Sequence, residues 1–146
     1  MSKKYKYTGK VRRIDGVVLR QIVRISDGEV GGWIQSHKNL SHDDNAWVSD
    51  NARVFGNAVV SDNAVVFGNA VVSDGMICTK SPLTASLNRH DITCSDGHIA
   101  VGCQIHDFDT WIKSVNFIGM RHGYDASDIT LYRSILLAMI EHRRAA

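Results

Sequence analysis

The sequence predicts a mainly β chain: a short stack of coiled strands, preceded by a β-hairpin and followed by a second hairpin and two α-helices. Three observations support this prediction. A six-residue phrase repeats five times without a slip between Asn45 and Asp74, apolar residues flank a turn signal at Asp15-Gly16, and apolar residues recur at helical spacing near the C-terminal end. A fixed period decides the architecture, because each repeated unit is too short to bury its own apolar face.

The N-terminal part predicts a β-hairpin. Residues 10–14 and 17–25 flank Asp15-Gly16, a two-residue turn that needs positive φ at both positions. One face would carry apolar residues suited to packing, namely Ile14, Val17, Leu19, Val23 and Ile25. The other face would show Tyr5, Tyr7, Arg13, Arg20 and Arg24 among Val11, Val18 and Ile22. Basic residues beside tyrosines can grip a planar anion, although arginine stems can also simply cover a solvated sheet face.

The charge distribution singles out the same segment. Residues 1–24 hold eight Lys or Arg residues against one acid, residues 25–74 hold two against seven, and the remainder holds seven of each. An electropositive end of this kind attracts phosphate or an acidic partner, or serves only as a solubilising surface.

The repeat predicts strands that turn a corner every six residues. In each hexad an alanine and the valine two places on point the same way along an extended strand. These inward pairs are Ala46/Val48, Ala52/Val54, Ala58/Val60, Ala64/Val66 and Ala70/Val72. An Asp or Gly followed by Asn then supplies a residue that tolerates positive φ. A small residue, a branched aliphatic and a corner describe one side of a triangular coil.

These residues resemble the left-handed parallel β-helix of the hexapeptide-repeat superfamily. The resemblance implies that three hexads make a coil of roughly 18 residues. Upstream, Ile34 and Leu40 keep the six-residue step, whereas downstream the phase fades at Met76, Cys78 and Pro82. We therefore divide the chain into an N-terminal hairpin cap (residues 1–29), a β-helix (30–83) and a C-terminal cap (84–146).

The outward positions of the repeat predict an assembly surface. Stacking at 18 residues gathers apolar side chains on the outside, namely Trp47, Phe55, Val59, Val65, Phe67 and Val71. A contiguous exposed apolar patch usually marks an interface, and the resemblance implies a threefold trimer. The alternatives are a dimer, or terminal segments that fold over this wall.

The last third of the chain predicts a hairpin and two helices. Residues 91–94 and 98–102 flank Ser95-Asp96-Gly97, residues 107–115 form a short helix, and residues 127–144 form a long one. The apolar positions of the helices are Phe108, Trp111, Ile112, Val115, Ile129, Tyr132, Ile135, Leu136, Met139 and Ile140.

A more specific resemblance is to small hexapeptide-repeat proteins of bacteriophages and prophages. It is carried by GGWIQS at residues 31–36, NLS at 39–41, the NAxV run, and VGC at 101–103 followed by His106 and Trp111. Most proteins of this group have no assigned activity. The resemblance therefore implies a phage or prophage origin rather than a reaction.

Catalysis and metal binding have little support in the sequence. Hexapeptide-repeat acyltransferases use a histidine base and an acyl-thioester cofactor, but the regular hexads contain no histidine, and only His37 and His42 lie just upstream. A zinc site or a thiol nucleophile could use the group Cys94, His98, Cys103 and His106, but no CxxC pair is present. We expect no catalytic residue, metal or cofactor.

The expected environment is the cytoplasm, that of the host cell if a phage encodes the protein. The longest strongly apolar run, residues 135–140, is too short to span a bilayer, and MSKKYKY leads into no signal core. Three cysteines without paired spacing argue against a disulfide framework. No membrane contact is expected.

The functional hypothesis is therefore a non-catalytic oligomeric binding protein of phage or prophage origin. It would sequester a phosphorylated nucleotide signal or block a host defence protein, with the ligand held by Tyr7, Arg13, Arg20, Arg24 and Arg53. The alternatives are a virion or assembly component and a hexapeptide-repeat acyltransferase. The sequence does not name the ligand or the host target.

Overall fold

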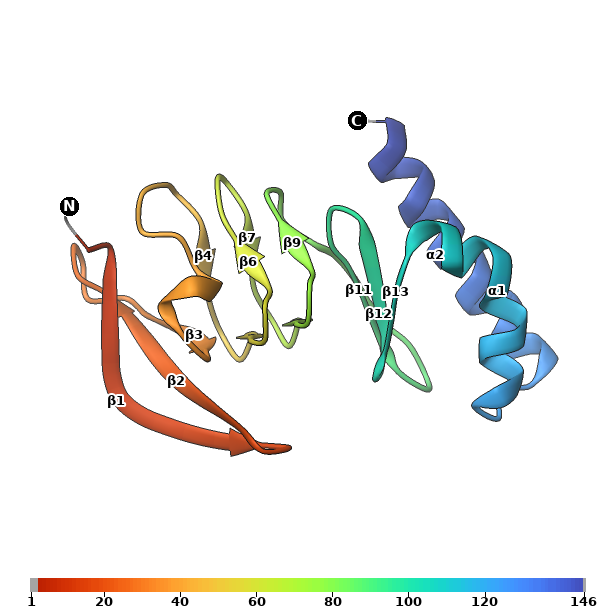
Figure 1. Cartoon of the computed structure of the whole chain (residues 1–146), viewed down its shortest axis with the longest axis horizontal. Helices are drawn as coiled ribbons and strands as arrows, with labels where there is room; N and C mark the ends of the chain where they lie inside the picture. The colour runs from red at the N-terminus through yellow and green to blue at the C-terminus, as the bar shows by residue number, and fades with distance from the viewer. Residues whose placement is uncertain (1–2, 146) are drawn as a thin grey trace.

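The computed structural model describes residues 3–145, and its elements mix β-strands and α-helices along one extended axis (Figure 1). In chain order they are β1 (Tyr5–Ile14), β2 (Val17–Arg24), β3 (Val30–Ile34), the 3₁₀ helix η1 (His37–Asn39), β4 (Trp47–Val48), β5 (Arg53–Val54), β6 (Val59–Val60), β7 (Val65–Val66), β8 (Val71–Val72), β9 (Ile77–Cys78), β10 (Leu83–Ser86), β11 (Asp91–Cys94), β12 (His98–Val101), β13 (Gln104–Asp107), α1 (Phe108–Arg121) and α2 (Ala126–Ala145). The N-terminal hairpin lies at one end of the axis and the helices at the other.

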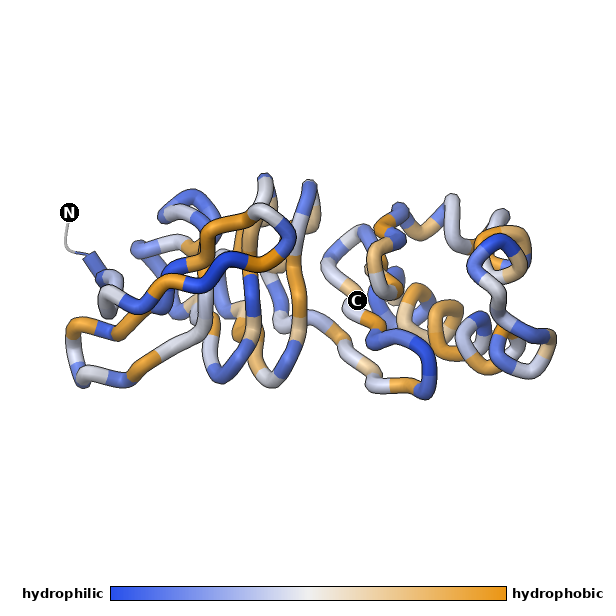
Figure 2. Tube along the Cα trace, turned by 90° about the horizontal axis from the view of Figure 1, so that it is seen from below, coloured by the Kyte–Doolittle hydropathy of each residue, from blue (hydrophilic) through white to orange (hydrophobic). Residues whose placement is uncertain are grey.

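The N-terminal hairpin and its turn form where the sequence predicted them, but Ile22, placed on the open face, is fully buried, and Ile25, placed on the packing face, is 49% exposed. Strands β1 and β2 are antiparallel, and the turn residues Asp15 and Gly16 have φ values of 50° and 81°. Strand β2 pairs with β3, β3 pairs in parallel with β5, and β5 pairs in parallel with β8. The hairpin is therefore part of a five-stranded sheet in the order β1-β2-β3-β5-β8. Along the hairpin, hydrophobic and hydrophilic residues alternate (Figure 2).

The repeat forms parallel strand pairs with the predicted offset. Strand β4 pairs with β7, β5 with β8 and β6 with β9, and each pairing joins residues 18 positions apart, such as Trp47 and Val65. Backbone hydrogen bonds link the same neighbours, for example from Ser49 N–H to Val66 C=O at 2.8 Å. Successive loops of the repeat therefore stack side by side (Figure 1).

The inward and corner positions of the hexads are confirmed. Nine of the ten predicted inward residues are fully buried, and the tenth, Ala70, is 7% exposed. The corner residues Asp50, Gly56, Asp62, Gly68 and Asp74 all have φ between 52° and 65°. Asp and Gly tolerate this left-handed region better than most residues, which explains why the corner always falls on one of them.

The repeat continues past Asp74 through one further unit, within the predicted bounds of residues 30–83. Met76 and Cys78 are both fully buried in the same core as the valines. Ile77 between them pairs with Val59 as strand β9. The predicted fading of the phase at Met76 and Cys78 is therefore wrong, because a thioether and a thiol fill the inner positions as well as alanine and valine do.

The first coil is fixed by a buried amide. The Asn39 side chain accepts from the backbone N–H groups of Gln35 and Ser36, and donates to the carbonyls of Gly56 and Ala58 at 3.1 and 2.9 Å. All its bonds go to backbone groups, so the amide ties the irregular turn to the following strands of the repeat. Ile34 and Leu40 are fully buried, as their six-residue spacing predicted.

The C-terminal unit is an antiparallel sheet covered by two helices. The sheet order is β10-β11-β12-β13, and α1 and α2 pack on it around a second apolar core. Helix α1 continues to Arg121, six residues beyond the prediction, so the chain is mixed α and β rather than mainly β. Asp96 at the β11–β12 turn accepts from Thr79 N–H and Oγ at 3.0 and 2.6 Å and so joins this unit to the repeat. Within residues 3–145, no helix has the length and apolarity to cross a membrane.

Candidate functional site

Two of the predicted ligand residues contact each other and a third lies beside them. The Arg20 guanidinium carbon lies 5.6 Å from the centroid of the Tyr7 ring, within cation–π range. Arg13 follows Val11, the cross-strand partner of Arg20, by two positions and so shares its face. Arg13 and Arg20 are exposed and form no salt bridge within residues 3–145.

Arg24 and Arg53 do not belong to this group. Arg24 forms salt bridges with Asp27 and Glu29 at 3.3 and 2.5 Å, and its guanidinium lies 4.6 Å from the Trp47 ring centroid. Its charge and its planar face are both occupied by the protein itself. Arg53 lies on β5 directly opposite Trp33, in another part of the five-stranded sheet. The five predicted residues are thus one cluster of three and two separate positions.

The predicted apolar wall is partly covered. Trp47 is 5% exposed, because Arg24 lies over its ring and the Tyr5 ring meets it edge-on at 6.4 Å. Tyr5, assigned to the open face of the hairpin, is fully buried, and its hydroxyl donates to the Leu40 carbonyl at 2.7 Å. The N-terminal segment therefore folds over Trp47, which is the alternative to its exposure at an interface.

The rest of the wall remains accessible to different degrees. Phe67, which follows strand β7, is 54% exposed, and Ile77 on strand β9 is 49% exposed. The other predicted interface residues are half-buried, namely Phe55, Val59, Val65 and Val71. The exposed apolar surface of the repeat is therefore smaller than predicted, and Trp47 on strand β4 does not contribute to it.

His37, held by His42, completes the Tyr7–Arg20 surface, the name used here for Tyr7, Arg13, Arg20 and His37. The Lys4 backbone N–H donates to His42 Nδ1 at 3.0 Å, so neutral His42 carries its proton on Nε2. That proton donates to His37 Nδ1 at 2.9 Å, which assigns the His37 proton to Nε2. The His37 ring lies 4.8 Å from the Tyr7 ring. His37 Nε2–H thus adds a neutral donor beside Tyr7.

Burial sets the protonation of these groups. It lowers the pKa of His37, helped by the charge of Lys3, and lowers the pKa of His42, helped by His37 and Lys4. Burial also raises the pKa of Tyr7, against the effect of Arg20. Near neutral pH the histidines are therefore uncharged and the tyrosine keeps its proton. The sequence shows two histidines five residues apart, but nothing in it places them against Tyr5 and Tyr7.

The cysteine and histidine group does not converge. Cys94 is buried, its thiol donates to the Ser95 carbonyl at 3.4 Å, and burial raises its pKa. Cys103 is exposed, and His106 Nε2 bonds to Gln104 Oε1 at 3.1 Å. Among residues 3–145, no three His, Cys, Asp or Glu side chains lie close enough to hold a metal ion.

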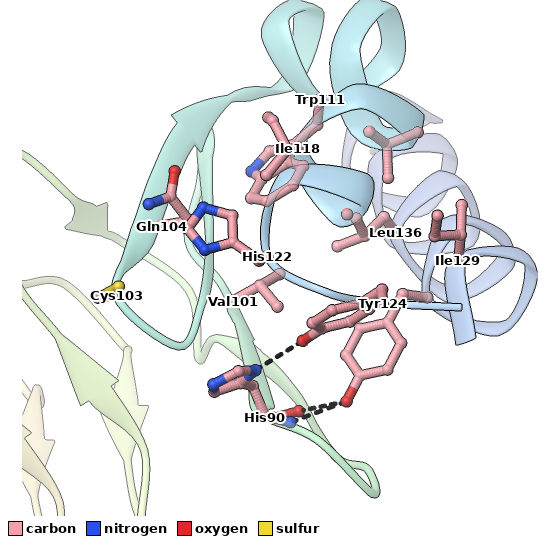
Figure 3. Close-up of a pocket in the computed structure, with 13 residues that line it drawn as sticks. His90, Val101, Cys103, Gln104, Trp111, Ile118, His122, Tyr124, Ile129 and Leu136 are labelled. Atoms are coloured by element: carbon pink, nitrogen blue, oxygen red, sulfur yellow. Dashed lines mark hydrogen bonds between the residues drawn. The ribbon is translucent and has the colours of Figure 1, made fainter. Parts of the chain in front are cut away.

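A cavity of about 70 Å³ lies between the β12–β13 edge of the sheet and the two helices (Figure 3). In Figure 3 the side chains of Trp111, Ile118, His122, Tyr124 and Leu136 surround a common space. The remaining lining residues are His90, Val101, Cys103, Gln104, Val115, Gly119, Ile129 and Tyr132. The apolar part of this lining comes mainly from the helical positions that the sequence placed in the core.

A polar network closes one side of the cavity. The Tyr132 hydroxyl accepts from the backbone N–H groups of Arg89 and His90 at 3.0 and 2.8 Å and donates to the His90 carbonyl at 3.1 Å. His90 Nδ1 bonds to the Tyr124 hydroxyl at 2.6 Å, and Asp128 accepts from Arg89 Nε at 2.9 Å. Burial, followed by the proximity of Tyr132, raises the pKa of Tyr124 to about 12. The Tyr124 phenol is therefore neutral near pH 7.

No protein-family model matches this chain, and no curated protein matches its sequence.

Proposed function

We propose that this chain is a non-catalytic, oligomeric binding protein of phage or prophage origin that sequesters a phosphorylated nucleotide signal and so acts against host defence. The observation that carries the proposal is the pairing of Arg20 with Tyr7 on an exposed surface. No acidic side chain within residues 3–145 neutralises Arg20 or its neighbour Arg13. Two free guanidinium groups beside an aromatic ring suit a ligand with a phosphate and a planar base.

The donor set supports an anionic rather than a cationic ligand. Arg13 and Arg20 can each present paired N–H donors to phosphate oxygens, and His37 Nε2–H adds a third donor. The segment of residues 1–24 carries eight Lys or Arg residues and a single acid. An exposed base could stack on the outer face of a guanidinium, whose inner face already lies on Tyr7. A host protein with an acidic patch could use the same charges.

For the fold, we propose that residues 30–83 form a short left-handed parallel β-helix that assembles as a trimer. The 18-residue pairing, the buried alanine and valine positions and the left-handed corners support the helix. The exposed Phe67 and Ile77 support the assembly, because large apolar side chains exposed on the outside of the repeat favour association. Three copies of the Tyr7–Arg20 surface would then share one rigid core.

Acyl transfer gains no support from the histidines. A general base needs a free lone pair on nitrogen, but His42 accepts at Nδ1 from Lys4 and donates at Nε2 to His37. His37 uses its lone pair at Nδ1 to accept that bond. Neither ring offers an unoccupied basic nitrogen in this arrangement.

The test is nucleotide binding by isothermal titration calorimetry with wild type and Arg20→Gln. The probes are a cyclic dinucleotide, a nucleoside triphosphate, inorganic phosphate and an uncharged nucleoside. We expect binding of at least one nucleotide, affinity that falls with salt, and a loss of about tenfold in Arg20→Gln, the order of one charge-assisted hydrogen bond. Phosphate or nucleoside alone should bind more weakly.

The matched control is Arg133→Gln, which removes one exposed arginine from helix α2. It changes the net charge equally but lies in the C-terminal unit, so nucleotide binding should stay within experimental error. Equal loss in both variants would mean a general charge effect, and no binding of any probe to wild type would refute the nucleotide proposal. Binding of a host protein that depends on Arg20 would replace it.

The trimer is tested by light scattering after size-exclusion chromatography. Phe67→Asp places a charge in the proposed interface, so we expect a change from trimer to monomer with an unchanged far-ultraviolet circular dichroism spectrum. Phe117→Asp is the control, because Phe117 is 61% exposed on helix α1, away from the repeat. A monomeric wild type, or a trimer retained in Phe67→Asp, would contradict the assembly.

A further inference from the structure

The cavity in the C-terminal unit is large for an interior space. Protein interiors are packed about as densely as organic crystals, with few voids larger than a water molecule. A space of about 70 Å³ is several times the roughly 10–15 Å³ that one water requires. It lies within the second apolar core, where an unfilled space forfeits the dispersion contacts of its walls. A ligand that filled it would restore those contacts.

The polar groups around the cavity are almost all paired within the protein. The Tyr132 hydroxyl uses its one donor and both acceptor positions on the backbone of Arg89 and His90. Trp111 Nε1–H donates to the Ile99 carbonyl at 2.8 Å, and the Tyr124 hydroxyl bonds to His90. A water molecule in the cavity needs two to four polar partners, which these walls do not offer. The interior of the cavity therefore favours an apolar occupant.

The mouth differs from the interior. His122 and Cys103 are exposed lining residues, and their side chains form no hydrogen bond within residues 3–145. In Figure 3 the His122 ring lies beside Gln104 and faces the space between the sheet and the helices. A polar group on the ligand would find a partner here. The ligand should accordingly have an apolar body and one polar edge.

Aromatic walls favour a flat ring as that body. The Tyr124 and Tyr132 rings meet edge to face, with centroids 4.9 Å apart and planes at 73°, and Trp111 lies on the opposite side of the space. Aromatic rings prefer this geometry, which is worth about 0.5–1.5 kcal/mol per pair beyond the area buried. An engineered apolar cavity of about 150 Å³ takes up benzene, so this smaller, open-mouthed cavity would take a ring with its polar edge left at the mouth.

We propose that this cavity binds a small monocyclic aromatic molecule with one hydrogen-bonding substituent, in the manner of a phenol. The ring would lie among Trp111, Val115 and Leu136, and the hydroxyl would donate to the His122 ring. This site is separate from the Tyr7–Arg20 surface, and neither requires the other.

The experiment is a titration of the full chain with phenol, followed by nuclear magnetic resonance. The indole N–H signal of Trp111 should shift and saturate, with a Kd in the range of roughly 0.1–1 mM that the few heavy atoms of phenol allow. The indole signals of Trp33 and Trp47 lie in the other half of the chain and should not move. Cyclohexanol, which has the same hydroxyl on a ring that is not aromatic, should bind at least about threefold more weakly.

Two variants locate the binding. Val115→Phe places a ring in the space and should weaken phenol binding by about tenfold or more, whereas Ile112→Phe, at an exposed position of the same helix, should leave it unchanged. His122→Ala should weaken phenol but not toluene, which has no hydroxyl. The proposal fails if phenol does not shift Trp111 in wild type, if Val115→Phe binds as wild type does, or if cyclohexanol binds equally well. The wild-type titration decides the question even if a variant does not fold.

Discussion

The repeat and the C-terminal unit build their cores differently. In the repeat, the inner positions from Ala46 to Cys78 are filled by Ala, Val, Met and Cys side chains, and the backbone of each loop bonds to the next. In the C-terminal unit, side chains of many shapes from a sheet and two helices meet, and they leave a cavity beside a network of tyrosines. Regular stacking fills the core of the repeat with side chains of one pattern, whereas the irregular packing of the C-terminal unit leaves a space. Binding should therefore be sought at the irregular parts of the chain.

The largest expected effect breaks the regular core. Val66 is fully buried on strand β7, so Val66→Asp would place a carboxylate among valines with no partner. We expect a loss of more than about 4 kcal/mol in the free energy of unfolding, enough to prevent folding. Circular dichroism and urea denaturation of the purified protein measure it.

The matched control is the adjacent position on the same strand. Val65 is half-buried and points outward, because neighbouring side chains alternate along a strand. Val65→Asp should cost no more than about 1 kcal/mol in a monomer, although it would weaken the proposed trimer. Equal losses in the two variants would contradict the assignment of inner and outer positions.

A smaller effect tests the irregular core. Tyr132→Phe removes the hydroxyl that bonds to the backbone of Arg89 and His90, and leaves two N–H groups without a partner. The expected cost is about 1–3 kcal/mol. Hydrogen exchange followed by mass spectrometry should show faster exchange in residues 83–145.

Hydrogen exchange in Tyr132→Phe also compares the two regions, because it shows whether the faster exchange stays within the C-terminal unit. The repeat makes its own backbone bonds and is joined to the C-terminal unit by a few contacts, such as those of Asp96 with Thr79. Exchange in residues 45–78 should therefore stay as in wild type. Faster exchange throughout the chain would show that the two cores unfold as one.

The sequence predicted the features that follow from local rules. The six-residue period located the inner positions and the corners of the repeat, because they depend only on side-chain alternation and on which residues tolerate positive φ. The Asp15-Gly16 turn was located by the same tolerance of positive φ. The predicted bounds of the repeat included Met76 and Cys78, but the expected loss of phase there does not occur, because both side chains occupy inner positions although they do not match the consensus.

The features that the sequence did not predict depend on how distant segments meet. Arg24 was counted among the ligand residues, but it is held by Asp27, Glu29 and Trp47 once the hairpin lies against the repeat. Tyr5 was placed on the open face and is buried for the same reason. The cavity arises where a sheet and two helices meet without filling the space between them, which no pattern in the chain encodes.

The smallest expected effect concerns pH and the contact between the hairpin and the first coil. Folding lowers the pKa of His37 and His42, from a reference of 6.5, through burial and through Lys3 and Lys4, while Asp43 acts in the opposite sense on His42. The unfolded chain therefore binds more protons than the folded chain as the pH falls through about 6.5, so this contribution to stability is present above that pH and is lost below it. A proton on His42 Nδ1 would also face the Lys4 N–H that it now accepts from.

Urea denaturation at pH 7.5 and pH 5.5 should show a lower midpoint at the lower pH in wild type. His42→Gln removes one of the two titrating groups, so the difference between the two midpoints should become smaller. His142→Gln is the control, because His142 is exposed at the end of helix α2, and it should keep the wild-type difference. If His42→Gln also keeps it, the pH dependence comes from other groups, and the histidine pair does not couple the hairpin to the repeat.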